Sequence, residues 1–492
     1  MVPPSSLRSL PPEGAVRQRP GKAGSVAGSL VVPLLRRSLP VWAAVLSACS
    51  FIPVHERPAA PVAAEFPLPA ATSGTPAPEL AWAHFLADAR LQALVDLALQ
   101  NNRDLRIAVL NVEQTRAALG LQRADRLPTL NAGAVASRTP GSGGDMVSAY
   151  SLGLQVTAFE LDLFGRVKSL SEAALARYLA SDEGRRAAQM TLIAAVANAE
   201  LTLRADDEQL QVTRSTLASR EEVLRLVRVR FEGGVAAEPE LRAAESLLAG
   251  ARATLAALQR QRQQDLNALV LLLGQPLPAD LPPAPPLNAF TLAELPVGLP
   301  SEVLLQRPDI RAAEQQLMAA NANIGAARAA FFPRITLTAS AGTASTQLSG
   351  LFENTAWAFT GNLLQPLFDA GRNQANLDAA RAAHGIAVAQ YEKAIQVAFR
   401  EVADALAGRA TLGQQLAAQQ AQVAAEARRV ELAELLLRGG AATLLDSLDA
   451  ERVLLVARQQ AVLLNLARLQ NEVLLYRVLG GGAGTMAVAA AE

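Results

Sequence analysis

The sequence predicts a mostly helical α+β chain in which one structural unit is written twice. Three observations predict this class: segments recur at a fixed spacing, four short segments alternate between apolar and polar residues, and two very long stretches contain no proline. Recurrence at a fixed spacing is typical of a duplicated supersecondary unit. We expect each unit to run in the order helix, two strands, very long helix, glycine turn, long helix.

The duplication rests on five pairs of segments that are separated by 205 or 206 residues. The pairs are RDLRIA with PDIRAA, RLPTL with FPRITL, LFGR with LFDAGR, RFEGGVA with LLRGGAA, and LLG with VLG. The prediction is a first repeat over 80–275, a proline-rich linker over 276–300 and a second repeat over 301–482.

The predicted strands lie near 129–137, 150–157, 334–341 and 357–363, where apolar and polar residues alternate. A period of two predicts strands with one apolar and one polar face. Such strands suit a membrane barrel with an aqueous lumen, and they equally suit a soluble antiparallel sheet with one wet face. In a membrane, a closed barrel needs at least about eight strands, and an open edge cannot sit in lipid. The chain would then borrow strands from its own copies, giving eight from two copies or twelve from three.

The predicted long helices lie between Pro140 and Pro239 and after Pro366. The run 169–230 alone would form a helix of about 90 Å. A seven-residue apolar spacing within these runs predicts helices packed in the manner of a coiled coil. The first stripe is Val196, Leu203, Leu210, Leu217, Leu224 and Phe231, and the second is Ile395, Val402, Leu416, Val423, Val430 and Leu437, interrupted by Arg409.

The N-terminal region reads as a signal peptide with an over-long leader over 1–48. Arg36 and Arg37 precede a short apolar stretch that ends in Leu-Ser-Ala-Cys, which resembles the bacterial lipoprotein box. We therefore expect Cys49 to be the lipid attachment site, followed by an extended tether over 49–79, although an ordinary signal with a stray cysteine remains an alternative. The last segment, 483–492, is expected to be a disordered tail.

Composition excludes several classes of function. Basic and acidic residues number 45 each, and no basic stripe with interleaved aromatics is present, so a nucleic-acid partner is not expected. The single cysteine excludes an internal disulfide framework, and the three histidines lie far apart. We expect no catalytic residue, metal or cofactor, and with no P-loop pattern any energy must come from a partner.

Three segments carry a family resemblance that covers roughly 80–482. They are LQRPDIRAAEQQLMAANANIGAARAAFFPRITL, FREVADAL and LLYRVLGGG. They are similar to signatures of the TolC-type outer-membrane efflux proteins, in particular the lipoprotein branch that serves resistance–nodulation–division pumps. The resemblance implies a homotrimer whose twelve-stranded β-barrel lies in the outer membrane and continues as a periplasmic α-helical barrel.

The same resemblance implies an exit duct that works with a periplasmic adaptor and an inner-membrane transporter. Alternatives are a duct driven by an ABC or major-facilitator transporter, a partner-free porin, and a lipid-anchored periplasmic scaffold. The adaptor would dock at the two glycine turns, which are Gly233, Gly234, Gly439 and Gly440.

The resemblance also implies a gate near the second glycine turn. Leu445 would form an apolar constriction and Asp449 a ring of carboxylates, while Arg452 and Thr443 would hold the closed state. Leu437 stands where many members carry a tyrosine, and Glu240 is the matching candidate in the first repeat.

Asp446 has a simpler expected role, which is to cap the restarting helix. At the positions that match Asp449 and Arg452, the first repeat has Ala243 and Ser246. This asymmetry predicts that the second turn moves and that the first turn is its fixed neighbour.

Overall fold

The computed structural model describes residues 50–66, 76–140, 143–290, 292–295 and 301–483. The predicted signal peptide, Cys49, the tail from 484 and parts of the proline-rich linker lie outside the described residues. The chain divides into Met1–Cys49 and Ser50–Glu492, and only the second unit is described below.

The first repeat has the predicted element order, except that two helices stand where one was expected before the strands. Its elements are α3 (Ala89–Asn101), α4 (Arg103–Ala124), β1 (Leu130–Pro140), β2 (Met146–Leu161), α5 (Arg166–Glu232) and α6 (Glu238–Leu273). Two short helical segments, η1 (Ala77–Glu79) and α2 (Trp82–Phe85), precede it, and η2 (Leu287–Ala289) follows.

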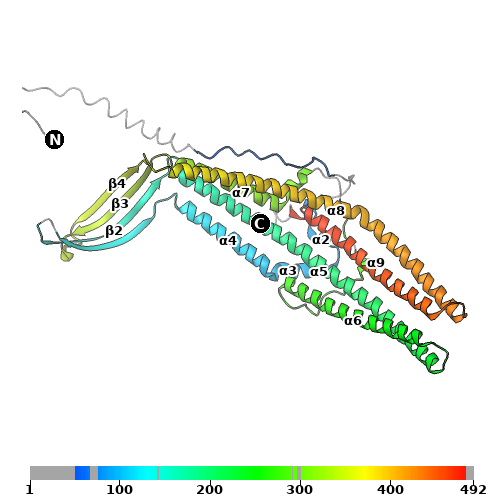
Figure 1. Cartoon of the computed structure of the whole chain (residues 1–492). Helices are drawn as coiled ribbons and strands as arrows, with labels where there is room; N and C mark the ends of the chain where they lie inside the picture. The colour runs from blue at the N-terminus through cyan, green and yellow to red at the C-terminus, as the bar shows by residue number, and fades with distance from the viewer. Residues whose placement is uncertain (1–49, 67–75, 141–142, 291, 296–300, 484–492) are drawn as a thin grey trace, which may run out of the picture. The chain divides into compact units, whose positions relative to one another are not determined.

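The second repeat follows the predicted order. Its elements are α7 (Pro308–Ala329), β3 (Arg334–Ser345), β4 (Thr355–Leu364), α8 (Arg372–Arg438) and α9 (Leu444–Val478), with the short η3 (Ser301–Gln306) and η4 (Leu348–Gly350). Within Ser50–Glu492 the strands lie at one end of the helices, and the turns of the α5–α6 and α8–α9 hairpins lie at the other (Figure 1).

The four strands form one antiparallel sheet in the order β1-β2-β3-β4. The register aligns the apolar positions across the sheet, since Leu130 lies opposite Val156, Val156 opposite Ala339, and Ala339 opposite Phe359. The next row consists of Asn131, Gln155, Ser340 and Ala358 and belongs to the other face. The predicted alternation is therefore confirmed, with one largely apolar and one largely polar face.

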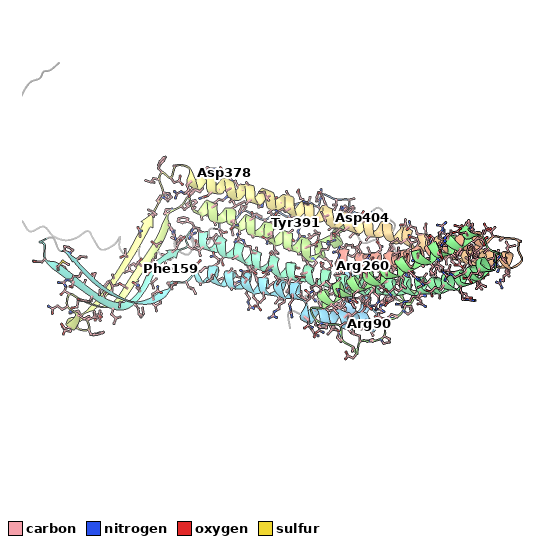
Figure 2. The ribbon with its side chains drawn as sticks, turned by 60° about the horizontal axis from the view of Figure 1, so that its bottom comes forward. Arg90, Phe159, Arg260, Asp378, Tyr391 and Asp404 are labelled. Atoms are coloured by element: carbon pink, nitrogen blue, oxygen red, sulfur yellow. The ribbon has the colours of Figure 1, made fainter. Side chains whose placement is uncertain are left out.

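A β-bulge in β2 keeps the apolar and polar faces of the sheet separate in the part of the strand that leads into α5. The register shifts between Val156 and Phe159, and Ala158 has a φ of 51°. The extra residue returns Phe159 to the apolar face, opposite Leu337, where unbroken pairing would have placed Ala158. In a regular strand, Val156 and Phe159 would lie on opposite faces, because they are three residues apart. The extra residue of the bulge brings both to the apolar face. Figure 2 shows Phe159 in the sheet.

A row of glycines crosses three strands at the centre of the sheet. Gly133 lies opposite Gly153, which lies opposite Gly342. A Cβ on Gly153 would lie 2.5 Å from the backbone oxygen of Ala341, and a Cβ on Gly342 would meet the backbone of Leu152 and Gly153. Neighbouring strands approach here more closely than side chains permit, and the strands curve visibly (Figure 1).

Helix α5 packs along several other helices of the described chain. Its 67 residues extend about 100 Å, and it packs against α4, α6, α7 and α9. The predicted stripe is buried at Val196, Leu203, Leu210 and Leu224. Phe231, the last member of the stripe, is 37% exposed and lies in the last turn of the helix.

Two arginines that lie among apolar side chains have polar partners. Arg409, which interrupts the second stripe, donates to the backbone oxygen of Leu295 at 2.9 Å and lies 3.8 Å from Glu472 of α9. Arg90 of α3, which Figure 2 labels, binds the fully buried Glu200 of α5 at 2.8 Å. Pairing of this kind offsets part of the cost of burying a charge.

None of the described helices combines the length and the apolar character that crossing a membrane requires.

Asp206 of α5 differs from the buried Glu200, which is paired with an arginine. Asp206 is only 6% exposed, and its Oδ2 has no hydrogen-bond partner among the described residues. Burial above all, and then a hydrogen bond with the carboxyl of Asp265, raise its pKa to about 7. Repulsion from Asp265 and Asp207 acts in the same direction, against the attraction of Arg262.

A raised carboxyl pKa predicts that the fold loses stability as pH rises. The stabilising protonated form is fully present below the unfolded pKa near 4 and is lost as pH passes through about 7. Between pH 5 and pH 8 the loss should be on the order of 1–3 kcal/mol. Asp206→Asn, which mimics the protonated acid, should reduce this loss in thermal unfolding followed by circular dichroism.

The matched control is Asp378→Asn, which removes an exposed carboxylate near the start of α8 (Figure 2). It should keep the pH slope of the unmodified protein. An equal slope in Asp206→Asn and the unmodified protein would contradict the assignment.

Candidate functional site at the hairpin tips

Both long helices end in the same backbone turn. Gly234 has a φ of 74° and Gly440 a φ of 72°, a left-handed conformation that L-residues other than glycine adopt at a cost. The N–H of Val235 donates to the oxygen of Arg230, and the N–H of Ala441 to that of Leu436, each at 2.8 Å. This is the Schellman pattern, so the predicted glycine turns exist in both repeats.

Helix α9 restarts with a capping box formed by Thr443 and Asp446. The Asp446 N–H donates to the Thr443 hydroxyl at 3.3 Å, and the Thr443 N–H donates to the Asp446 carboxylate at 2.9 Å. The hydrogen bonds from the Thr443 hydroxyl and backbone lower the pKa of Asp446. The predicted capping role of Asp446 is therefore confirmed, and the described contacts of Thr443 lie within its own hairpin.

Asp449 and Arg452 lie together, as expected one helical turn apart. Arg452 Nη2 donates to Asp449 Oδ1 at 2.7 Å, and Arg429 of α8 donates to Oδ2 at 3.0 Å. Hydrogen bonds from Arg452 and then Arg429 lower the pKa of Asp449, so the carboxylate stays ionised near neutral pH.

Sequence reasoning missed Arg429, although a signal existed. Arg429 lies ten residues before Gly439, and Asp449 lies ten residues after it. Residues at equal distances from a tight turn meet in an antiparallel helical hairpin, so this pair could have been found by counting from the glycine.

The remaining predicted gate residues lie in different surroundings. Leu445 is 49% exposed, and Leu437 packs into an apolar cluster. Glu240 forms no ion pair among the described residues, since Arg242 binds Glu238 at 3.1 Å and Glu245 at 2.9 Å instead. The structure thus brings Asp449, Arg452 and Thr443 to one tip but does not join Glu240 to them.

An apolar tip cluster ties the two hairpins of one chain together. Its members are the buried Leu224, Val227, Leu241, Ala244, Leu248, Leu444 and Leu448, with Leu217, Val223, Leu247 and Leu437 at its edge. Leu444 and Leu448 come from α9, and the other buried members come from α5 and α6. Each fully buried leucine contributes about 1.5–3 kcal/mol, so the contact between the hairpins within one chain is chiefly apolar here.

Among the described residues, no group of three or more His, Cys, Asp or Glu side chains could hold a metal ion. Pairs of carboxylates and arginines at the tips can instead set local charge and hold helices in position.

The two glycines of each turn should respond differently to substitution. Gly440→Ala forces a side chain into a left-handed backbone conformation and should destabilise the tip by about 1 kcal/mol. Gly439→Ala is the matched control, because Gly439 has a φ of −80° and its nearest contact would be an ordinary 3.5 Å. Equal thermal unfolding midpoints for the two variants would contradict the turn geometry.

The outer membrane efflux protein family model matches residues 94–275 and 299–481. The chain is 46% identical over 464 residues to the solvent efflux pump outer membrane protein SrpC of Pseudomonas putida, covering 91% of this chain and 98% of that protein. It is 45% identical to the outer membrane protein OprJ of Pseudomonas aeruginosa, covering 89% of this chain and 94% of that protein.

Solved structures agree with this relationship. The open state of the Neisseria gonorrhoeae MtrE outer membrane channel superposes with a TM-score of 0.83 at 43% identity, covering 88% of this chain and 99% of that one. A structure of CusC superposes with a TM-score of 0.80 at 41% identity, covering 88% of this chain and 100% of that one. Matching both repeats and nearly the full length of its relatives, the chain belongs to the outer membrane efflux protein family, whose members are channels and not enzymes.

Proposed function

We propose that this chain is the outer-membrane exit duct of a tripartite efflux pump and that it passively conducts small molecules from the periplasm to the exterior. The observation that carries the proposal is the combination of a half-apolar sheet with two unpaired edges and two helical hairpins built on 67-residue helices. A simple porin needs the strands but has no use for helices of about 100 Å.

The proposed assembly is a homotrimer. In the described chain, β1 and β4 are the edge strands and each pairs on one side only. An edge with free N–H and C=O groups is not stable in lipid, so β4 of one copy would pair with β1 of the next. Three copies close a barrel of twelve strands, with the apolar face towards lipid and the polar face towards the lumen.

Lipidation at Cys49 would anchor each copy to the outer membrane. The described residues that follow Cys49 support a fixed course for this segment. Phe51 stacks on Phe332 at 4.6 Å between ring centroids, and Arg57 binds Glu314 of α7 at 2.7 Å. Phe332 lies between α7 and β3, next to the sheet, so the described segment that begins at Ser50 starts beside the proposed barrel.

The hairpin tips are the proposed docking sites for a periplasmic adaptor, at Gly233, Gly234, Gly439 and Gly440. Exposed apolar side chains surround both turns, and they are Val229, Val235, Leu435 and Leu436. An adaptor would cover these side chains and connect the duct to an inner-membrane transporter that supplies the energy. Relatives are described as solvent, toluene and antibiotic efflux proteins, so we propose small apolar or amphipathic cargo.

The second tip is the proposed gate. Leu445 would narrow the lumen, and Asp449 from three copies would form a carboxylate ring of the kind that favours cations. Arg452 and Arg429 each neutralise part of this charge at hydrogen-bond distance. Mutual repulsion of the ring is thereby reduced, which favours a closed tip.

Export in cells tests the proposed function. In a strain that lacks its own efflux duct, the chain with its cognate adaptor and transporter should restore tolerance to toluene or antibiotics. Removing the adaptor should abolish this tolerance. Tolerance that persists without the adaptor would support a partner-free porin. Strands that proteases cleave in outer-membrane fractions would support a lipid-anchored periplasmic scaffold.

Breaking the contacts of Asp449 with Arg452 and Arg429 should loosen the tip, because Asp449→Ala leaves two arginines without their carboxylate and Arg452→Ala leaves more of the carboxylate charge unpaired. Asp449→Ala and Arg452→Ala should each raise single-channel conductance in planar bilayers at least twofold and increase the entry of large antibiotics. Arg428→Ala is the control, because Arg428 forms an exposed ion pair with Glu431 on α8, near the same tip. Unchanged conductance in both gate variants would overturn the assignment.

A further inference from the structure

A cavity of about 280 Å³ lies where the sheet joins α5, α7 and α8, at the end of the helices that faces away from the hairpin tips (Figure 1). Three arginines from three elements line it, Arg166 from α5, Arg334 from β3 and Arg372 from α8. Its apolar wall includes Phe332 and Leu364. The cavity therefore combines guanidinium groups with apolar side chains, as small-molecule sites commonly do.

The cavity borders the polar face of the sheet. Glu160 of β2, which lines it, lies opposite Thr336, whereas the neighbouring pair of Phe159 and Leu337 belongs to the apolar face. Arg334 is two residues from Thr336 in β3 and so shares its face. In the proposed assembly the polar face surrounds the lumen, which would place this cavity along the conduit at the periplasmic end of the barrel.

Two of the three arginines share one carboxylate. Arg166 donates from Nε and Nη2 to the two oxygens of Glu160, each at 2.7 Å. Arg334 Nε lies 2.6 Å from Glu160 Oε2. The Glu160 side chain is only 11% exposed, so its charge is fully committed to these two guanidinium groups.

Arg372 has no carboxylate partner among the described residues, and its side chain is exposed. Asp369, which also lines the cavity, accepts the backbone N–H groups of Gly371 at 3.0 Å and Asn373 at 2.9 Å. Asp162 likewise accepts a backbone N–H at the start of α5. The formal charges of the lining sum to zero, but both aspartates are engaged at positive helix ends, and only the guanidinium of Arg372 is unpaired.

The duplication shows how such an arginine is paired in the first repeat. Arg166 and Arg372 correspond at an offset of 206 residues, and each directly follows a glycine with a positive φ at the start of a 67-residue helix. Six residues before Arg166 stands Glu160, but six residues before Arg372 stands Pro366. The second repeat thus keeps the arginine without the carboxylate that binds its counterpart through both oxygens.

We propose that Arg372 binds the carboxylate of an anionic molecule with an aromatic or alkyl body. The carboxylate would meet the guanidinium as Glu160 meets Arg166, because the two planar groups match in geometry. The body would lie against the apolar wall that includes Phe332 and Leu364. This inference deepens the proposed function, on which the position in the lumen rests, and it assigns the duct a site that favours amphipathic carboxylates as cargo.

Binding of benzoate to the full-length protein in mild detergent tests the site without relying on transport. Benzamide, which has the same ring but no charge, is the matched probe. In saturation-transfer NMR titrations, Arg372→Gln should raise the Kd for benzoate at least fivefold and leave that for benzamide unchanged. Arg372→Lys keeps the charge but loses the fork of donors, so its Kd for benzoate should lie between the two.

Arg381→Gln is the matched control, because Arg381 forms an exposed ion pair with Asp378 on the same helix and does not line the cavity. It should bind benzoate as the unmodified protein does. Equal benzoate affinity in Arg372→Gln and the unmodified protein would overturn the site. Loss of trimers in Arg372→Gln, measured by native mass spectrometry, would assign Arg372 to a contact between copies and would also overturn it.

The binding and export measurements separate this inference from the proposed function. If the chain restores export in cells but Arg372→Gln binds benzoate unchanged, the site is wrong and the duct stands. If benzoate binding depends on Arg372 but the chain restores no export, the proposed function fails, the anion site stands, and its role in cargo selection is wrong.

Discussion

Pairing of the backbone groups at the two edges of the sheet is the constraint on which the rest of the structure depends. Strands β1 and β4 each expose a row of N–H and C=O groups, and lipid offers these groups no hydrogen bonds. The apolar face formed by rows such as Leu130, Val156, Ala339 and Phe359 nevertheless suits lipid. In the proposed trimer, joining β4 of one copy to β1 of the next would resolve the conflict, and the chain would then close only together with its own copies.

The arrangement of the strands also determines the arrangement of the long helices, because strand and helix follow each other directly in the chain. Each β-hairpin leads directly into a 67-residue helix, so in the proposed trimer a ring of strands would impose a ring of helices and bring three equivalent tips together. At each tip the contacts within one chain are chiefly apolar, through Leu444 and Leu448, while Asp449 remains on the surface with two arginines. Apolar contacts of this kind allow small movements of one hairpin relative to the other, while the surface arginines offset the charge of Asp449.

Much of this could be predicted from sequence because the signals are local or repeated. Alternation predicted the strands, the absence of proline predicted the helices, and the spacing of 206 residues located both glycine turns. The bulge at Ala158 and the row through Gly133, Gly153 and Gly342 could not be predicted, because they depend on the register between strands from different repeats.

The mass of the intact protein tests the central claim of closure by copies most directly. Native mass spectrometry of the protein released from mild detergent measures how many chains share one particle. The account predicts three chains, which supply twelve strands and leave no open edge. A particle of one or two chains that still conducts ions in bilayers would contradict it, because closure would then not need three copies.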